Sequence, residues 1–241
     1  MTTDPVTGAE PQLSYRQVLR DRRLATLLAG DAISKTGDGA SFVGLPLLAL
    51  QLHGSVPAAL AVALVTGAPL VAPVGLNLYF GLGRRRFDPR LVLLIDSSVR
   101  AVMFLVLGAL AMAGTLEFGL LLGLLVAGSV VRLLSSSARR LAAVEMVDED
   151  GRLAVNGLLG TSDNLSMFVV GPALGGLVVA LHGPDLVLVL NGVSYLAMLA
   201  AAALVVPRAR RGEAGDVTEV SSGWAIMRRM PVVVRLALVV F

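Results

Sequence analysis

The sequence contains no cysteine, only two histidines and few aromatic residues. The lack of cysteine excludes disulfides, thiolate catalysis and cysteine-based metal sites. The histidines, His53 and His182, both lie in predicted loops, so neither fits a catalytic triad or a metal site. Aromatic residues make up 5% of the chain, too few for a platform on which nucleic-acid bases stack. No glycine-rich phosphate loop follows a strand. The sequence therefore predicts no enzyme, no catalytic residue, no metal and no cofactor.

Charged residues are also scarce, at 15% of the chain, whereas a typical soluble domain is about one quarter charged. Apolar residues make up 56% and gather in six long runs. A helix needs about 20 mostly apolar residues to cross about 30 Å of hydrocarbon. The runs do not alternate apolar and polar residues, as the strands of a membrane barrel would. We therefore predict an all-α integral membrane protein, a bundle of six transmembrane helices at 24–50, 58–82, 91–113, 117–138, 155–180 and 186–206.

Arginines mark every second connection between these runs. The connections at 84–90 and 139–152 and the segment after residue 206 are rich in arginine, and the other connections carry no lysine or arginine. Because basic residues stay on the cytoplasmic side of a membrane, we predict a multi-pass protein of the plasma membrane with a cytoplasmic N-terminus. The same rule accounts for the net charge of +3 without nucleic acid as a partner.

The predicted organisation has four parts. Residues 1–23 form a polar cytoplasmic segment, and residues 24–206 form the six-helix bundle. Residues 207–230 form a cytoplasmic linker, whose end fits either a short amphipathic helix or a plain basic linker. A seventh apolar run, 231–241, is too short to cross a bilayer. We interpret it as the start of a truncated seventh transmembrane helix.

Several ionisable residues lie inside the predicted spans, where each costs at least about 2.5 kcal/mol unless it is paired or hydrated. Asp31, Lys35 and Asp38 share one face of the first span, which fits an Asp–Lys pair or a polar stripe along a cavity. Arg132 in the fourth span and Asp163 in the fifth lie at a depth similar to that of Asp31. Similar depth permits ion pairs between these helices.

These five residues form the predicted pathway for substrate and protons. Proton-coupled transport requires a carboxylate exposed alternately to two sides, beside a cation that changes its proton affinity. Structural ion pairs are the alternative explanation. Three acids (Asp31, Asp38 and Asp163) against two bases (Lys35 and Arg132) sum to −1, which slightly favours a cationic substrate.

The fifth predicted span contains a glycine-proline motif, with Gly171, Pro172, Gly175 and Gly176. Glycines four residues apart let helices approach closely, and the proline removes a backbone donor and bends the helix. Ordinary helix packing in a membrane produces the same pattern. The motif therefore predicts a close helix contact.

Several short motifs, in this order, resemble the major facilitator superfamily, in particular its drug and siderophore exporters. Gly37-Asp38, followed by residues 45–50, is similar to the first span of these transporters. The loop between their second and third spans is similar to the stretch that holds Arg86, Asp88, Arg90, Asp96 and Arg100. The Gly171–Gly176 stretch is similar to the antiporter motif of the exporters. The resemblance covers the amino-terminal half of a typical member.

The resemblance implies a secondary active transporter in the lipid bilayer, specifically a proton-coupled exporter of small amphipathic molecules. It implies a gating role for the loop residues and an antiporter role for the glycine motif. Family members rock two six-helix halves around a site at the membrane midplane, which implies a second six-helix half as partner. Two functions stay open at this point, transport by a truncated chain and a membrane module that does not transport by itself.

Overall fold

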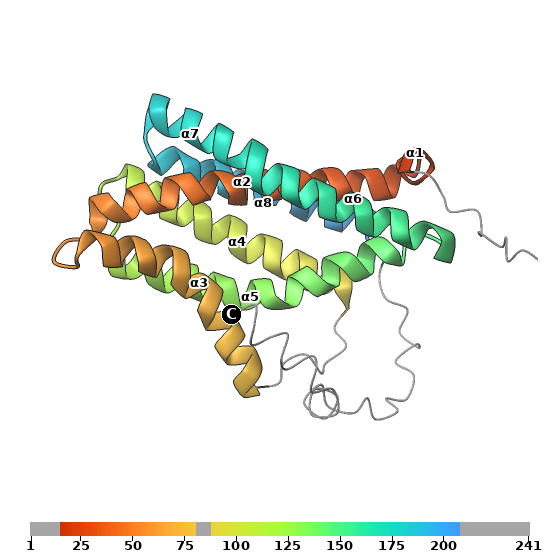
Figure 1. The fold of residues 1–241 in the computed structure, drawn as a ribbon, viewed down its shortest axis with the longest axis horizontal. Coiled ribbons are helices and arrows are strands. Elements are labelled where there is room, and N and C mark those ends of the chain that lie inside the picture. The colour runs from red at the N-terminus through yellow and green to blue at the C-terminus, as the bar shows by residue number, and fades with distance from the viewer. Residues whose placement is uncertain (1–14, 81–87, 208–241) are drawn as a thin grey trace, which may run out of the picture. The chain divides into compact units, whose positions relative to one another are not determined.

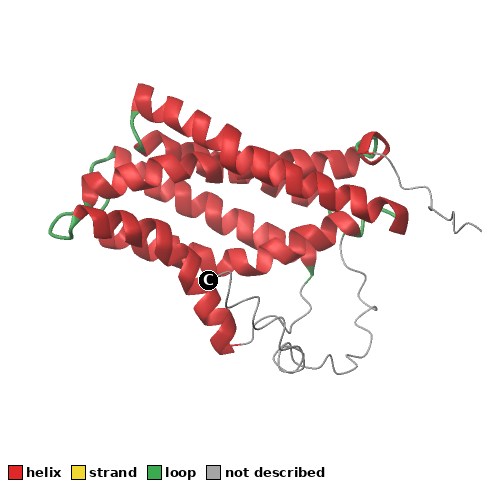
Figure 2. Ribbon diagram, viewed as in Figure 1, coloured by secondary structure: helices red, strands yellow, loops and turns green. Residues whose placement is uncertain are grey.

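The structure is a computed structural model that describes residues 15–80 and 88–207. All regular structure in these two ranges is helical (Figures 1 and 2). The elements are α1 (Tyr15–Val18), α2 (Arg22–Leu52), α3 (Ala58–Phe80), α4 (Pro89–Met112), α5 (Phe118–Val144), the 3-10 turn η2 (Glu149–Gly151), α6 (Arg152–Leu165), the π-helical turn η3 (Ser166–Val170), α7 (Gly171–His182) and α8 (Asp185–Val205). Arg86, nearly all of the predicted linker and the predicted seventh helix lie outside the described residues.

The prediction of helices is confirmed at all six apolar runs, the fifth of which is the continuous stretch α6, η3 and α7. Three described stretches are long and apolar enough to cross a membrane: Pro89–Met112, Glu149–His182 and Asp185–Val205. The apolar parts of α3 and α5, at Ala58–Val71 and Phe118–Arg132, are shorter. The structure thus supports a multi-pass membrane protein, and the number of six spans stays a prediction.

One predicted boundary is wrong in a way that matters for the site. The fourth run was expected to end at residue 138, but α5 continues to Val144. The added turns contain arginine and alanine, both good helix formers, and Ala142 and Ala143 are buried. Arg139 therefore belongs to a helix that lines the bundle interior, rather than to a loop.

The three short connections between long helices each turn at one glycine. Gly54, Gly114 and Gly183 have φ angles of 54°, 69° and 89°. Residues with a side chain avoid this left-handed region, whereas glycine enters it freely. Figure 1 shows the α2–α3, α4–α5 and α7–α8 connections at the same end of the bundle. The described α5–α6 connection lies at the other end of the bundle, in agreement with the alternation in the sequence.

Helices α2 and α8 pack closely because glycines of α2 face α8. The facing pairs are Gly30 with Ala201, Gly37 with Ser194 and Gly44 with Val187. The residues are spaced seven apart on each helix and run in opposite directions, so the two helices are antiparallel. A Cβ atom at Gly30 would lie 2.6 Å from the Ala201 Cβ atom. Small residues at such a seam let membrane helices approach closely.

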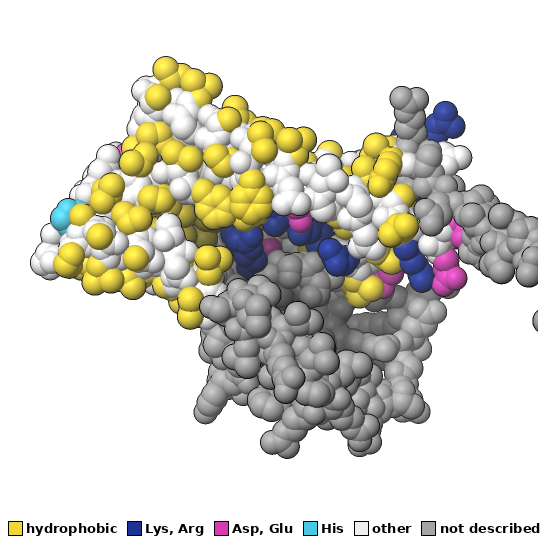
Figure 3. Space-filling view, viewed as in Figure 1, with side chains coloured by type: hydrophobic (Ala, Val, Ile, Leu, Met, Phe, Trp, Pro, Cys, Tyr) yellow, Lys and Arg dark blue, Asp and Glu magenta, His cyan; other side chains and the backbone are white. Residues whose placement is uncertain are grey.

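The outer surface of the bundle is largely apolar. Exposed apolar side chains occur on every long helix, among them Ile33, Leu60, Val102, Phe168 and Leu204. Figure 3 shows apolar atoms over most of the visible face, with basic and acidic side chains in the middle of the bundle and at the end opposite the tight turns. An apolar belt with charges turned inward is typical of a protein surrounded by lipid.

Candidate functional site

A polar layer lies between two apolar clusters of the bundle. On α2, for example, Leu27 and Leu28 belong to one cluster and Leu48 to the other, and Asp31 and Asp38 lie between them. Helices α4 and α5 follow the same order, and on α8 Tyr195 of one cluster and Met198 of the other border the layer. The layer encloses a cavity of about 40 Å³, which has room for a few water molecules. Its lining is formed by Asp31, Ser34, Lys35, Asp38, Leu93, Asp96, Ser97, Arg100, Arg132, Ser135, Arg139, Tyr195 and Met198.

Asp38 joins four helices at one end of this cavity. Its Oδ1 atom accepts hydrogen bonds from the Tyr195 hydroxyl at 2.6 Å and from Nη2 of Arg100 at 3.3 Å. Its Oδ2 atom lies 4.0 Å from Nη2 of Arg132. These residues come from α2, α8, α4 and α5, and the Asp38 side chain is only 7% exposed. A buried carboxylate needs such compensation, because an unpaired charge in the interior is costly.

Two aromatic rings fix the guanidinium of Arg100. Its Cζ atom lies 4.6 Å from the centre of the Tyr195 ring and 5.9 Å from that of Phe104. The two rings are nearly parallel, with centres 6.1 Å apart. Cations bind the faces of aromatic rings favourably. Arg100 is therefore held by these rings as well as by Asp38.

A second ion-pair cluster connects α2, α5 and α6. Nη1 of Arg139 lies 2.5 Å from Oδ1 of Asp31, and Nη2 of the same residue lies 3.1 Å from Oδ2 of Asp163. The other oxygen of each carboxylate is buried and finds no hydrogen-bond partner among the described residues. One guanidinium thus serves two carboxylates.

The structure shows which of these charges pair. Similar depth permits ion pairs among Asp31, Arg132 and Asp163, but Arg139 pairs with both acids and Arg132 lies near Asp38. Arg139 was not among the candidates because it falls in a predicted loop. Lys35 lines the cavity, and within the described parts of the chain it forms no ion pair within 4.0 Å. A role for Lys35, paired with Asp31 or along a polar stripe, stays a prediction.

The residues of the predicted gating loop occupy two different places. Asp88 caps α4 by accepting a 2.9 Å hydrogen bond from the Arg90 backbone, and the Arg90 side chain donates to the Ala203 carbonyl of α8 at 2.7 Å. Asp96 and Arg100 lie deeper on α4 and line the cavity beside Asp38. A gating role for any of these residues stays a prediction.

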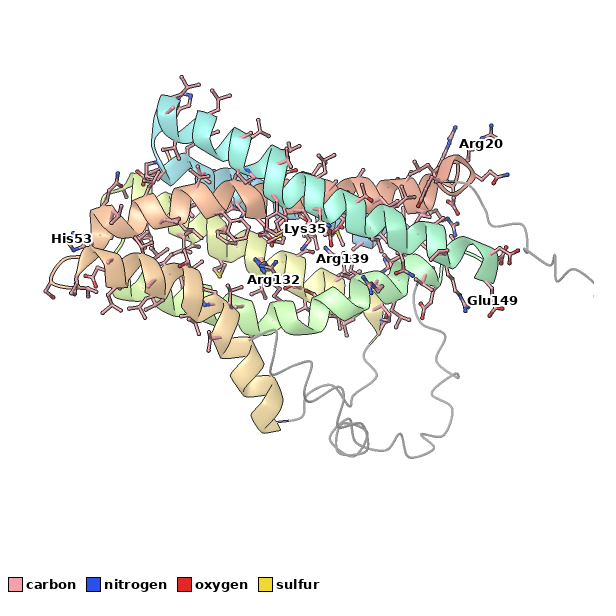
Figure 4. The ribbon with its side chains drawn as sticks, viewed as in Figure 1. Arg20, Lys35, His53, Arg132, Arg139 and Glu149 are labelled. Atoms are coloured by element: carbon pink, nitrogen blue, oxygen red, sulfur yellow. The ribbon has the colours of Figure 1, made fainter. Side chains whose placement is uncertain are left out.

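A larger cavity of about 90 Å³ adjoins the charged layer. Asp38, Arg100 and Arg132 line both cavities. The rest of the larger cavity is mostly apolar, with Phe42, Leu45, Pro46, Val65, Leu70, Met103, Phe104, Leu125 and Met167 in its wall. Figure 4 shows Lys35, Arg132 and Arg139 together in the middle of the bundle; all three line the smaller cavity, and Arg132 also lines the larger one. The arrangement can hold a molecule with one polar and one apolar part.

The glycine-proline motif packs α7 against α2. A Cβ atom at Gly171 would lie 2.6 Å from the Gly39 Cα atom, and one at Gly175 would lie 2.6 Å from the Ala40 carbonyl oxygen. The predicted close approach is confirmed for these two glycines, whereas Gly176 faces open space. The π-helical turn Ser166–Val170 ends directly before Gly171 and Pro172. Proline cannot donate the helical hydrogen bond, which accounts for an irregular turn at this place.

Comparison with known proteins agrees with this architecture. A sequence model of the Major Facilitator Superfamily matches residues 27–241. The chain belongs to the major facilitator superfamily. The searches of curated proteins and of solved structures returned no match. Major facilitator proteins are membrane transporters with small-molecule substrates, so an enzymatic role is disfavoured.

Two residues of this major facilitator site were missed by the sequence reasoning. Arg139 lies seven residues after Arg132, hence on the same face of α5 two turns further on. This spacing identifies Arg139 as a residue of the site only if the fourth predicted span continues past residue 138. Tyr195 lies four residues after Asn191, and both are buried on α8. The polar groups of Asn191 and Tyr195, four residues apart within an apolar run, were the signal in the sequence that could have identified Tyr195.

Proposed function

We propose that this major facilitator protein is a proton-coupled exporter of small amphipathic molecules, in the plasma membrane with its N-terminus in the cytoplasm. The observation that carries the proposal is the Asp31–Arg139–Asp163 cluster beside a cavity with one charged end and one apolar wall. An ionisable group within a membrane protein is expensive to keep and marks substrate or proton pathways.

The cluster is suited to exchange a proton because it holds more acid than base. Arg139 neutralises one of its two carboxylates, and protonation of either acid leaves the guanidinium paired with the other. Asp31 also faces Lys35 on its own helix and the water-sized cavity that Asp38 and Asp96 line. A proton that enters there breaks a contact either between α2 and α5 or between α5 and α6. Loading a proton therefore changes which helices are held together.

The substrate part of the proposal rests on the larger cavity. Its wall is apolar, and three charged side chains at one end connect it to the proton cluster through the shared lining. An amphipathic molecule matches that division. We propose further that the bundle works against a second six-helix half around a shared midplane site. The Gly171–Gly175 seam between α2 and α7 is the part of the bundle that supports export, by its likeness to the antiporter motif.

Everted membrane vesicles that carry the full chain test this proposal. An imposed pH gradient, acidic inside, should drive accumulation of at least one of three dyes: ethidium (cationic), carboxyfluorescein (anionic) or Nile red (neutral). A protonophore should abolish the accumulation. Asp31→Asn and Asp163→Asn should reduce it to the level of vesicles without the protein, because either change removes an exchangeable proton.

The matched control is Asp150→Asn, since Asp150 is exposed on η2. This variant should accumulate dye as the unaltered protein does. Accumulation that persists with the protonophore would contradict proton coupling, and no accumulation of any dye would contradict the export function.

A further inference from the structure

We infer that the larger cavity selects anions: it takes an amphipathic molecule whose carboxylate or similar acid group binds Arg132. The inference deepens the proposed function, on which its biological meaning rests, because it names the substrate class of the same cavity. Binding itself needs neither a gradient nor transport, so the two proposals can fail separately.

The charges of the lining favour an anion. Among the described residues, the larger cavity is lined by one acid, Asp38, and two bases, Arg100 and Arg132. The smaller cavity also has one more base than acid, with Lys35, Arg100, Arg132 and Arg139 against Asp31, Asp38 and Asp96. The sum of −1 that favoured a cationic substrate omitted Arg139. Arg139 adds one positive charge to that sum and brings it to zero. Asp96 and Arg100, which the sum also omitted, cancel each other.

Hydrogen bonding shows which of these charges are available to a ligand. Oδ1 of Asp38 already accepts two hydrogen bonds, and Arg100 is held by Asp38 and two aromatic rings. Arg132 differs from both. Its guanidinium makes no hydrogen bond to another described residue, its nearest acid oxygen is 4.0 Å away, and its side chain is 37% exposed. The hydrogen-bond donors that are free to bind a ligand where the two cavities share their lining therefore belong to Arg132, a cation.

The unpaired acid oxygens lie elsewhere. Oδ2 of Asp31 and Oδ1 of Asp96 lack hydrogen-bond partners among the described residues, but both residues line only the smaller cavity. A cationic ligand in the larger cavity would meet both Arg132 and Arg100 with a single acid, Asp38, whose Oδ1 atom accepts two hydrogen bonds and whose Oδ2 atom lies 4.0 Å from Arg132. An acid group there would gain charge-assisted hydrogen bonds from Arg132, with its apolar part against Phe42, Val65 and Leu125.

The test compares three water-soluble ligands that share one apolar part. Equilibrium dialysis of the detergent-purified full chain would measure binding of 4-phenylbutyrate, 4-phenylbutylamine and 4-phenylbutanol. We expect the butyrate to bind at least about tenfold more tightly than the amine, as loss of one charge-assisted hydrogen bond implies. Arg132→Gln should weaken butyrate binding by about tenfold, whereas Arg140→Gln, an exposed arginine of the same helix, should leave it unchanged.

A charge reversal at Arg132 distinguishes a loss of the binding group from a loss of the fold. Arg132→Glu should reverse the preference, so that the amine binds more tightly than the butyrate, which a misfolded protein would not do. Equal or tighter binding of the amine to the unaltered chain, or butyrate binding that does not depend on Arg132, overturns the inference. Arg132-dependent butyrate binding without gradient-driven transport would instead support the inference and contradict the proposed function. Proton-driven export of ethidium but not of carboxyfluorescein would support the proposed function and contradict the inference.

Discussion

The Tyr195 hydroxyl of α8 donates a 2.6 Å hydrogen bond to the Asp38 carboxylate of α2, at the place where the two cavities meet. Both side chains are buried. The same carboxylate oxygen binds Arg100, whose guanidinium lies over the Tyr195 ring. Three helices are thereby connected through a single oxygen atom. Loss of this contact should therefore lower the stability of the bundle.

Tyr195→Phe should lower the free energy of unfolding by about 1–2 kcal/mol. The change removes one hydrogen bond to a buried carboxylate, and hydrogen bonds to charged groups are worth about 1.5–3 kcal/mol in water-soluble proteins and less in membranes. The phenylalanine ring keeps the stacking with Phe104 and the contact with Arg100. Thermal unfolding in detergent measures the effect. Tyr15→Phe, at an exposed tyrosine of α1, should change nothing, and an equal loss in both variants would contradict the assigned contact.

Arg139→Gln should destabilise the bundle far more, by about 3–5 kcal/mol. Removal of one partner from a buried ion pair leaves an uncompensated charge, and here it leaves two, on Asp31 and Asp163. The double change Arg139→Gln with Asp31→Asn should recover part of the loss, because it removes one of them. A double-mutant cycle with thermal unfolding separates this coupling from the single effects. If the two effects simply add, the pair seen between Asp31 and Arg139 is not important for stability.

The helices were predictable from the sequence because lipid imposes a simple rule on length and composition. A run of about 20 apolar residues is visible without any knowledge of packing. Glycine positions were also informative: the close approach at Gly171 and Gly175 follows from their spacing. Family membership followed from the order of short motifs, and the match to residues 27–241 confirms it.

The partners within the site were not predictable in the same way. Depth along a helix restricts which charges can meet, but rotation of each helix decides which do. Arg132 and Arg139 share a face of α5, and only the packing places one beside Asp38 and the other between Asp31 and Asp163. Tyr195 was missed because a phenol inside an apolar run reads as an ordinary core residue. Its hydrogen bond depends on the α2–α8 contact.

The membrane topology can be tested directly, since the chain has no cysteine of its own. Ser55 lies in the exposed α2–α3 turn, and Asp150 lies in the exposed η2 turn. Positive charges near the second site predict that it lies in the cytoplasm. A membrane-impermeant maleimide should therefore label Ser55→Cys in intact cells, and label Asp150→Cys only after the cells are opened. The opposite pattern would reverse the predicted orientation, and labelling of both sites in intact cells would contradict a membrane between them.

Neighbouring glycines of the α7 motif should respond differently to the same change to alanine. A Cβ atom at Gly175 would lie 2.6 Å from the Ala40 carbonyl oxygen and 2.7 Å from the Ala40 Cα atom, whereas nothing lies within 4 Å of one at Gly176. The backbone of α2 can yield only if the helices separate, and overpacking of this kind costs about 1–3 kcal/mol. Gly175→Ala should thus lower the unfolding temperature in detergent.

Gly176→Ala should leave the unfolding temperature unchanged or raise it, because alanine is favoured over glycine in a helix by about 0.5–1 kcal/mol. The two variants have the same composition and lie in the same turn, so general effects of an added methyl group cancel in their difference. A shared rise would mean that α2 and α7 do not touch at Gly175. A shared fall would mean that Gly176 also faces a helix. Only a fall at Gly175 without one at Gly176 assigns the motif to the α2–α7 seam. Any movement of α7 relative to Asp31 on α2 has to accommodate this contact.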